Sequence, residues 1–453
     1  MRFLLINPWI EDSAAFDYWL KPVGLLYVAA ILRRYGHEVF LIDCLDRFDE
    51  EVKPFSSSCR KLEYGMGSFV CHEIDKPQII KDIPRKFKRY GFPEEIFMDK
   101  LSTYSKQNID AVLLTTTMTY WYKGTVDTVE HVRRIFPDTP VFLGGIYTNI
   151  LPEHARSTFS PLNVKVLPGT GLSPVIELLK YFEQDYDSFD WFEELDPAYD
   201  LYKSDLQYAV LLSSIGCPYR CSYCMTPNMW SYKYRSVERI KNNVELIISK
   251  KSIKDVVFFD DAFLLHPQLQ ELLEMLSTFE TRYHLPNGIH AKKVSPLVAK
   301  LLKKANFKTI RLGYETSDSS LQKKTGGKVS NADLVNAVGN LKNAGFSSTD
   351  IGAYIIGNLP QQNKDDIYNA INFCFDLEIL PIVNEYTPIP GTKDHYDLLE
   401  QEIFSSDTDP FLLNNKYLPF WWRKGIDNVQ MQEIKDYLHI ERSKFVKRKA
   451  GDL

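Results

Sequence analysis

The sequence predicts an α/β protein built from two successive series of βα units. Short apolar runs alternate with longer stretches of helical periodicity, which is typical of parallel sheets covered by helices on both faces. The chain has 453 residues, of which 44% are hydrophobic and 25% are charged. These values suit a globular protein of two or three domains.

The first series occupies residues 1–180 and predicts a Rossmann-like domain. Its strands are expected at Phe3–Ile6, Glu38–Ile42, Ala111–Thr116, Val141–Leu143 and Val164–Leu167. Helical patterns cover Val23–Tyr35 and Pro174–Phe182, and a third ends near Arg134. Such sheets bind ligands beyond the carboxyl ends of their strands. The candidate binding loops therefore start at Asn7, Thr115, Gly144 and Pro168.

The connection between the second and third strands is longer than a crossover needs and predicts an insert at about residues 47–108. It carries Cys59, Cys71 and a basic segment from Lys81 to Arg89. One interpretation of the basic segment is a solvated helix face. The other is a lid or a docking surface for an acidic substrate or partner.

An acidic and aromatic stretch, residues 181–205, is interpreted as a linker, and the second series follows over residues 206–395. Its strands are expected at Tyr208–Leu212, Val256–Phe259, Gly288–Ala291, Thr309–Tyr314, Ile351–Ile356 and Ile382–Tyr386. Six strands are fewer than the eight of a complete βα barrel. Residues 396–453 predict a helical C-terminal extension.

Three cysteines on one short segment, Cys217, Cys221 and Cys224, suggest a metal centre. A structural zinc site normally has four protein ligands, and ordinary four-iron clusters are held by four cysteines. No fourth cysteine lies near these three in the sequence, so they predict an iron–sulfur cluster with one iron open to a ligand. The alternative is a zinc site completed by a distant histidine, for which the candidates are His266, His284 and His290.

The spacing Cys-x3-Cys-x2-Cys, with Tyr223 just before the last cysteine, resembles the radical S-adenosylmethionine (SAM) superfamily. The resemblance implies a 4Fe-4S cluster whose open iron chelates the amino and carboxylate groups of SAM. Reduction then cleaves SAM to methionine and a 5′-deoxyadenosyl radical. It also implies a partial (β/α)6 barrel, which agrees with the six expected strands, and an external reductant such as flavodoxin or ferredoxin.

Further candidate SAM ligands follow the expected barrel strands. The resemblance implies that Glu315 binds the SAM ribose and that Ile356 and Gly357 pack against the adenine. Asp260 and Asp261 would contact SAM or the substrate. The alternative interpretations are helix capping for the three acids and a simple turn for the glycine segment.

The first domain resembles the cobalamin-binding domain that precedes many radical SAM barrels, through Pro22-x-Gly-Leu-Leu, Leu143-Gly-Gly and Pro168-Gly-Thr-Gly. The implied cobalamin contacts are Gly24, Leu25, Thr116, Thr117, Met118, Tyr120, Gly144, Gly145, Pro168 and Gly169. The Asp-x-His-x-x-Gly motif that supplies a cobalt ligand elsewhere is absent. We therefore hypothesise that Thr117, Met118 or Tyr120 faces the lower side of the cobalt.

Together these resemblances imply a cobalamin-dependent radical SAM enzyme, most simply a methyltransferase acting on an unactivated carbon. One SAM would methylate cobalamin, and a second would yield the radical that activates the substrate. Three alternatives stay open: a cobalamin-dependent rearrangement or cyclisation, a radical SAM enzyme without cobalamin, and a non-catalytic zinc protein. Methylthio transfer is disfavoured, because Cys44, Cys59 and Cys71 are too widely spaced for a second triad.

The bulk properties restrict the partners. A net charge of −5 disfavours a nucleic-acid partner, and the longest apolar run, Val23 to Leu32, is too short for a membrane span. Seven cysteines without a disulfide pattern suggest a reducing cytoplasm. The expected substrate is a peptide, a protein or a small molecule.

Overall fold

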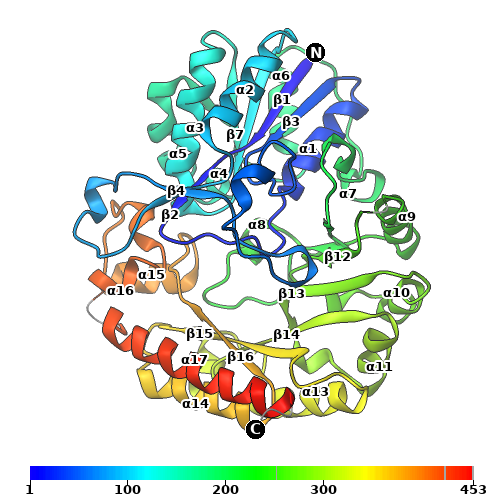
Figure 1. The fold of residues 1–453 in the computed structure, drawn as a ribbon, viewed down its shortest axis with the longest axis vertical. Helices are drawn as coiled ribbons and strands as arrows, with labels where there is room; N and C mark the ends of the chain where they lie inside the picture. Colours follow the sequence, from blue (N-terminus) through cyan, green and yellow to red (C-terminus); the bar gives the residue numbers. More distant parts are fainter. Residues whose placement is uncertain (251, 423–424, 451–453) are drawn as a thin grey trace. The chain divides into compact units, whose positions relative to one another are not determined.

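The computed structural model describes residues 1–250, 252–422 and 425–450, and its chain forms two compact units (Figure 1). The first unit comprises Met1–Val210, Asn243–Lys254 and Pro410–Leu412. The second unit comprises Leu211–Asn242, Asp255–Asp409 and Leu413–Leu453. None of the described helices combines the length and the apolar character needed to cross a membrane.

The first unit contains a five-stranded parallel sheet, as predicted. The strands in spatial order are β3 (Glu38–Asp43), β1 (Arg2–Asn7), β6 (Ala111–Thr116), β7 (Val141–Gly145) and β8 (Val164–Val166). Counted along the chain, this order is 2-1-3-4-5, which is that of flavodoxin-like sheets. The direction of strand addition reverses between β1 and β6. In such sheets the carboxyl ends of the strands at the reversal are where a ligand binds.

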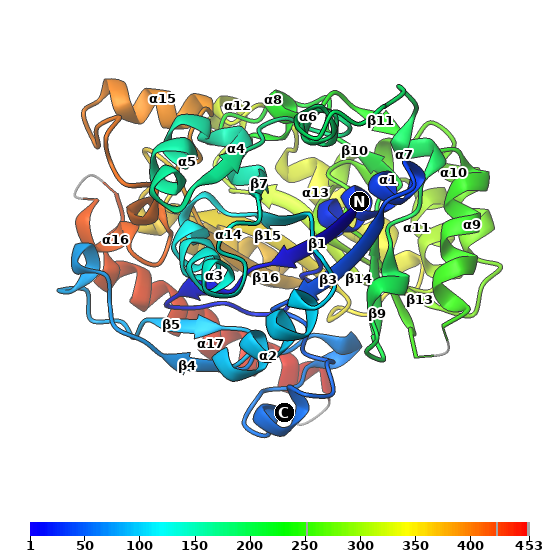
Figure 2. The same cartoon turned by 90° about the horizontal axis from the view of Figure 1, so that it is seen from above.

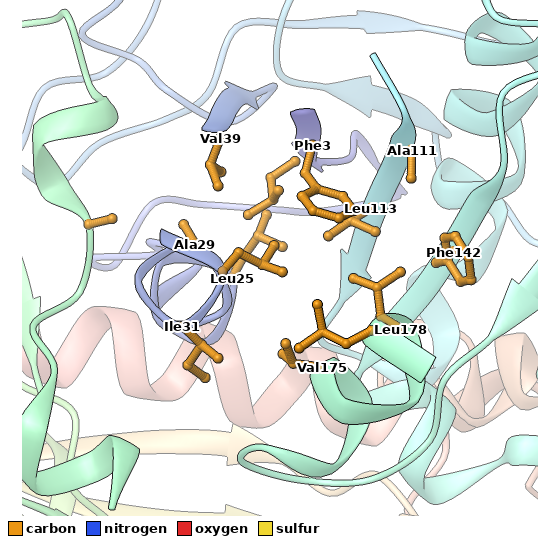
Figure 3. Packing of buried hydrophobic residues seen from close by; sticks show 14 residues of the cluster. Phe3, Leu25, Ala29, Ile31, Val39, Ala111, Leu113, Phe142, Val175 and Leu178 are labelled. Carbon is orange, nitrogen blue, oxygen red and sulfur yellow. The ribbon is translucent and has the colours of Figure 1, made fainter. Parts of the chain in front are cut away.

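The core of this unit lies between the sheet and two helices, α1 (Val23–Arg34) and α6 (Ser173–Tyr181). Figure 3 shows Leu25 of α1 and Leu178 of α6 close to Phe3 and Leu113 of the sheet. Leu25, Ala29 and Leu32 recur at helical spacing, so α1 presents one apolar face to the strands. Ala198, from the stretch expected to be a linker, is buried in the same core.

The other helices of the first unit are α2 (Glu94–Ser105), α3 (Tyr122–Ile135), α4 (Ile146–Ile150), α5 (Pro152–Phe159) and α7 (Trp191–Glu194). α7 lies within the expected linker. The Trp191 ring packs against Tyr27 of α1 at 5.2 Å between centroids, and Asp200 pairs with Arg33 at 2.7 Å. These residues thus pack on the first unit.

Two strands of the insert, β4 (Cys71–Glu73) and β5 (Lys88–Tyr90), form a small antiparallel sheet with β2 (Ile10–Asp12), which precedes the insert in the chain. β4 and β5 lie side by side in Figure 2. The basic segment ends in β5, so its interpretation as a helix face is wrong. Arg89 is buried, with its guanidinium 3.0 Å from Glu11 and 2.6 Å from Asp127. Side chains alternate between the two faces of β5, so the Arg89 side chain points inward, where Glu11 and Asp127 neutralise its charge.

A six-stranded sheet has its strands in sequence order. They are β9 (Tyr208–Leu211), β12 (Asp255–Phe258), β13 (Arg282–His290), β14 (Phe307–Glu315), β15 (Ile351–Gly357) and β16 (Leu380–Glu385). Five of them belong to the second unit, and β9 spans the division of the chain at Val210 and Leu211. The pairs from β12 to β16 are parallel. All six expected strands are present. The third begins at Arg282 rather than Gly288, because the sequence Pro286-Asn287-Gly288 conceals a strand whose register shifts between Leu285 and Ile289.

Helices α10 (Leu269–Leu276), α11 (Pro296–Lys304), α13 (Asn331–Asn343) and α14 (Lys364–Asp376) connect these strands. The expected helical C-terminal region is present as α15 (Lys393–Glu400), α16 (Leu418–Trp421) and α17 (Asn428–Ala450). α17 lies along α14 (Figure 1), where Tyr437 contacts Tyr368 and Phe445 contacts Phe375. The closure of the sheet into a partial barrel stays a prediction.

Candidate functional site

The cysteine loop, residues 216–225, follows the short strand β10 (Ser214–Ile215) and precedes α8 (Thr226–Met229). Cys217, Cys221 and Cys224 are free thiols, each partly buried. Gly216 opens the loop with a φ of +75°, and a Cβ on it would lie 2.8 Å from the carbonyl oxygen of Ser231. Only glycine fits this turn without strain. The backbone therefore directs three thiols into one short loop.

Two segments from later in the chain hold this loop. The Ser222 amide donates to the carbonyl of Thr325 at 3.3 Å, and the Ser222 carbonyl accepts from the Asp394 amide at 3.0 Å. Gly326 has a φ of +118°, and a Cβ on it would lie 3.2 Å from the Cα of Cys221. The turn after α12 (Ser319–Lys324) and the start of α15 thus fix the loop from two directions.

An ion pair between buried Glu315 and partly buried Lys328 stands next to the thiols. Glu315 ends β14 with a φ of +72°, and its Oε1 lies 3.0 Å from Nζ of Lys328. Burial raises the pKa of the Tyr223 hydroxyl well above its usual value, and the neighbouring Glu315 and Cys221 raise it further. Burial lowers the pKa of Lys328, but Glu315 and Cys221 outweigh burial and raise it overall, so the lysine is charged. Burial raises the pKa of the Cys217 and Cys221 thiols, and the Lys328 cation partly offsets this rise at Cys221.

Asp260 follows β12 and stabilises the start of the cysteine loop. Its carboxylate accepts hydrogen bonds from the backbone amides and the hydroxyls of Ser213 and Ser214, including 2.7 Å from the Ser214 hydroxyl. Burial raises the pKa of Asp260 to about 6, despite these four bonds. Asp261 is exposed and accepts a hydrogen bond from Thr226. Asp260 therefore acts within the protein, whereas Asp261 is open to a ligand.

The capping alternatives for the acids are wrong. α10 has Gln268 as its N-cap, and the N-cap of α12 is Asp318. Glu315 and the Asp260–Asp261 pair therefore cap neither helix. At the end of β15, a Cβ on Gly357 would lie 3.1 Å from Val383, and the Ile356 carbonyl accepts from Gln362. Ile356 and Gly357 are thus packed against neighbouring residues at the end of β15.

Of the three candidate histidines, one lies beside the cysteine loop. His284 hydrogen-bonds to Asp255 at 2.9 Å and His266 to the Arg235 carbonyl at 2.9 Å, both away from the thiols. His290 is buried, with Nε2 3.9 Å from the Cys217 sulfur. Burial lowers its pKa to about 3, so the ring is neutral.

Within the described ranges, no three His, Cys, Asp or Glu side chains lie close enough together to hold a single metal ion. A four-iron cluster is larger than an ion and takes its cysteines on different irons, so it does not require such convergence. The donor set fits a cluster, because three free thiols lie on one loop next to the partly buried cation of Lys328.

In the first unit, a pocket with an empty volume of about 340 Å³, partly open to solvent, lies at the strand-order reversal. Its lining comprises Asn7, Pro8, Trp9, Ile10, Leu20, Lys21, Pro22, Leu45, Thr116, Thr117 and Trp121. Lys21 is buried there, with Nζ 3.0 Å from Asp46, 3.6 Å from Asp43 and 4.5 Å from the Tyr202 ring centre. Burial lowers the pKa of Lys21, but the two carboxylates outweigh it and raise the pKa overall.

The remaining predicted cobalamin contacts fall into two groups. Met118 is exposed, Tyr120 and Pro168 are partly buried, and a Cβ on Gly24 or Gly144 would meet no close contact. Three others make contacts within the protein. Leu25 lies in the hydrophobic core, and a Cβ on Gly145 would lie 2.5 Å from the Thr116 carbonyl oxygen. The Gly169 amide donates a hydrogen bond to the Asn149 side chain. Of the predicted contacts, the pocket brings together Thr116 and Thr117.

Sequence reasoning missed several residues around the thiols, namely Lys328, Gly326 and Asp394. All three lie in or next to glycine-containing segments, because Gly326 and Lys328 belong to Gly326-Gly327-Lys328 and Asp394 follows Gly391-Thr392. Their approach to the cysteine loop depends on the sheet bringing distant segments together. Lys21 was missed because nothing in its local sequence indicates burial.

Comparison with known proteins agrees with this geometry. Residues 211–374 match the family described as the radical SAM superfamily. An uncharacterised methyltransferase of Pyrococcus horikoshii is 26% identical over 56% of this chain, which spans about half (54%) of that relative. The hopanoid C-3 methylase of Methylococcus capsulatus is 23% identical over 88% of this chain and 73% of its own length.

One solved structure shares the fold over most of the chain. It is the radical SAM methyltransferase TsrM from Kitasatospora setae, with cobalamin and a [4Fe-4S] cluster bound. The match has a TM-score of 0.63 at 15% identity and covers 90% of this chain and 79% of that one. At 15% sequence identity, this structural similarity shows that the two proteins share a fold.

The close approach of Gly326 to the cysteine loop can be tested by substitution. We expect Gly326→Ala to lower the free energy of unfolding by about 1–3 kcal/mol, since it adds a Cβ against Cys221 to an unfavourable φ. The matched control is Gly327→Ala, where φ is +61° and nothing lies within 4 Å. Urea unfolding of both variants measures the difference. Equal losses would show that the contact with Cys221 contributes nothing.

Proposed function

Residues 211–374 form a radical SAM domain, and from this premise we propose that the chain is a cobalamin-dependent methyltransferase acting on an unactivated carbon. The observation that carries the proposal is the cysteine loop, which is fixed beside the Glu315–Lys328 pair. The hopanoid C-3 methylase, similar over most of this chain, is named for methylation at a carbon.

On this proposal Cys217, Cys221 and Cys224 each bind one iron of a 4Fe-4S cluster and leave the fourth iron for SAM. When bound, the cluster supplies the electron that cleaves SAM to methionine and a 5′-deoxyadenosyl radical. Lys328 would offset the negative charge of the thiolates, and Tyr223 lies next to Cys221 and Glu315. These contacts hold the loop in one geometry before SAM arrives.

SAM would lie at the ends of the strands that follow the loop. Glu315 is buried and its Oε1 is held by Lys328, which would orient the carboxylate to accept hydrogen bonds from the ribose. Ile356 and Gly357 offer backbone to the adenine, and exposed Asp261 is a further polar contact. Asp260 contributes by orienting Ser213 and Ser214.

Cobalamin would bind to the first unit at the carboxyl ends of β1 and β6 and would supply the methyl carrier there. Thr116 and Thr117 line the pocket at this edge, and Met118 is exposed next to them. The apolar and aromatic lining, with Trp9 and Trp121, excludes water from one wall. Thr117, Met118 or Tyr120 is the proposed neighbour of the cobalt.

The substrate would be a peptide, a protein or a small molecule, and the electron donor a flavodoxin or ferredoxin of the cytoplasm. Radical SAM enzymes in general require a reductant and a substrate. A reducing compartment suits free thiols such as the exposed Cys71 and the partly buried triad.

Alanine substitution of any triad cysteine tests the cluster assignment. We expect each variant to fall from about four irons per chain to near zero and to produce no 5′-deoxyadenosine, because a cluster missing one thiolate is lost. Iron and sulfide analysis after anaerobic reconstitution measures the first effect, and chromatography measures the second. Cys59→Ala, a partly buried thiol of the first unit, is the control and should retain the iron. Full iron content in the triad variants, or zinc in the native protein, would refute the assignment.

The loop after β6, which carries Thr117, Met118 and Tyr120, can be examined by the visible spectrum of bound cobalamin. We expect joint replacement of Thr117, Met118 and Tyr120 by alanine to shift the visible absorption of bound cobalamin, since the spectrum responds to the lower cobalt environment. The control is Met229→Ala, which alters a methionine of the second unit. An unchanged spectrum at full cobalt content would reject these residues as neighbours of the cobalt.

The reaction itself is tested by anaerobic reconstitution with cobalamin and SAM carrying a labelled methyl group. A methyltransferase should produce 5′-deoxyadenosine and S-adenosylhomocysteine and pass the label through cobalamin to substrate. Deoxyadenosine with no movement of the label would instead indicate a rearrangement or cyclisation. Iron without bound cobalt would indicate a radical SAM enzyme that does not use cobalamin.

A further inference from the structure

His290, the last residue of β13, has no role in the function proposed above. Its side chain is buried, with 3% of the residue exposed. Nε2 lies 3.9 Å from the sulfur of Cys217, and the ring stacks on Tyr219 with 4.8 Å between centroids and 24° between planes. Nδ1 is buried and has no hydrogen-bond partner among the described residues. The ring is therefore held by a stacking contact and directed at one sulfur.

We propose that His290 is a positioning residue for the iron–sulfur cluster, donating a hydrogen bond from Nε2 to the Cys217 thiolate. This inference rests on the proposed function, because it requires a thiolate at Cys217. Nε2 is the ring nitrogen that faces the sulfur, and Nδ1 is the one without a partner in the described part of the chain. A buried N–H without a partner is rarer in proteins than an unpaired acceptor. The proton therefore belongs on Nε2, facing the sulfur, and Nδ1 is left as the acceptor.

The surroundings of His290 distinguish it from the other buried histidine of the same strand. His284 hydrogen-bonds through Nε2 to Asp255 and through Nδ1 to Thr309, so both of its nitrogens stabilise the sheet. His290 instead has the Cys217 sulfur as its polar neighbour on the Nε2 side. The Tyr219 ring covers one face of the imidazole and restrains its plane, so the N–H direction is fixed.

A hydrogen bond to a cluster sulfur changes the energy of reduction. Cluster potentials are set in part by hydrogen bonds to the sulfurs and by solvent exposure. Reduction adds negative charge, and an N–H dipole directed at the thiolate stabilises that charge. His290 therefore makes the cluster easier to reduce, and its removal should shift the midpoint potential to a more negative value.

The experiment compares reconstituted wild-type protein with His290→Phe, His290→Gln and His290→Asn by redox titration monitored by electron paramagnetic resonance, with iron content measured in parallel. His290→Phe keeps an aromatic ring for stacking and removes the N–H. We expect it to retain iron and to have a more negative potential. Glutamine places an amide N–H near the position of Nε2, so His290→Gln should return toward wild type, whereas the shorter asparagine should not. Tyr219→Phe keeps the stacked ring and should leave the potential unchanged.

Unchanged potential and g-values in His290→Phe would overturn the inference while leaving the cluster assignment intact. If His290→Phe fails to retain iron, the comparison of glutamine with asparagine decides, and a glutamine variant no closer to wild type than the asparagine variant would also overturn it. Wild-type protein that holds no cluster would overturn both this inference and the proposed function.

Discussion

The candidate active site depends on the hydrogen bonds and the close backbone contact that fix the cysteine loop. The loop has little regular structure of its own, and both the amide and the carbonyl of Ser222 are paired with residues far along the chain. Gly326 can approach the backbone of Cys221 closely because it has no side chain. Asp260, which follows β12, accepts a hydrogen bond from Ser214 at the start of the loop. The sheet of the second unit is the common frame that brings these segments together.

Both units place a lysine between acidic groups at the carboxyl ends of parallel strands. Lys328 lies between Glu315 and the thiols, and Lys21 lies between Asp43 and Asp46. Charges out of water are costly unless they are paired in good geometry. Each lysine therefore holds its acidic partners in place, which gives each strand edge a rigid polar surface where a ligand would bind.

The strands, the parallel sheets and the triad could be predicted from the sequence because each has a local signal. Hydrophobic runs marked the strands, and the cysteine spacing is contained within eight residues, Cys217 to Cys224. The start of β13 was missed because Pro286 and Gly288 interrupt its pattern. Lys328, Asp394 and His290 could not be assigned, since their importance arises from contacts with the cysteine loop that only the folded sheet creates. Asp260 was correctly noticed, but its carboxylate is used internally by Ser213 and Ser214.

The pairing of Ser222 with Thr325 and Asp394 has a consequence for the biogenesis of the protein. A chain still being synthesised folds from its N-terminus, so the first unit can form its sheet while the second is incomplete. The cysteines leave the ribosome early, but the loop acquires its final shape only after α15 has emerged and docked. The three thiols are thereby brought into their final arrangement late in folding, after the cysteines themselves have been synthesised.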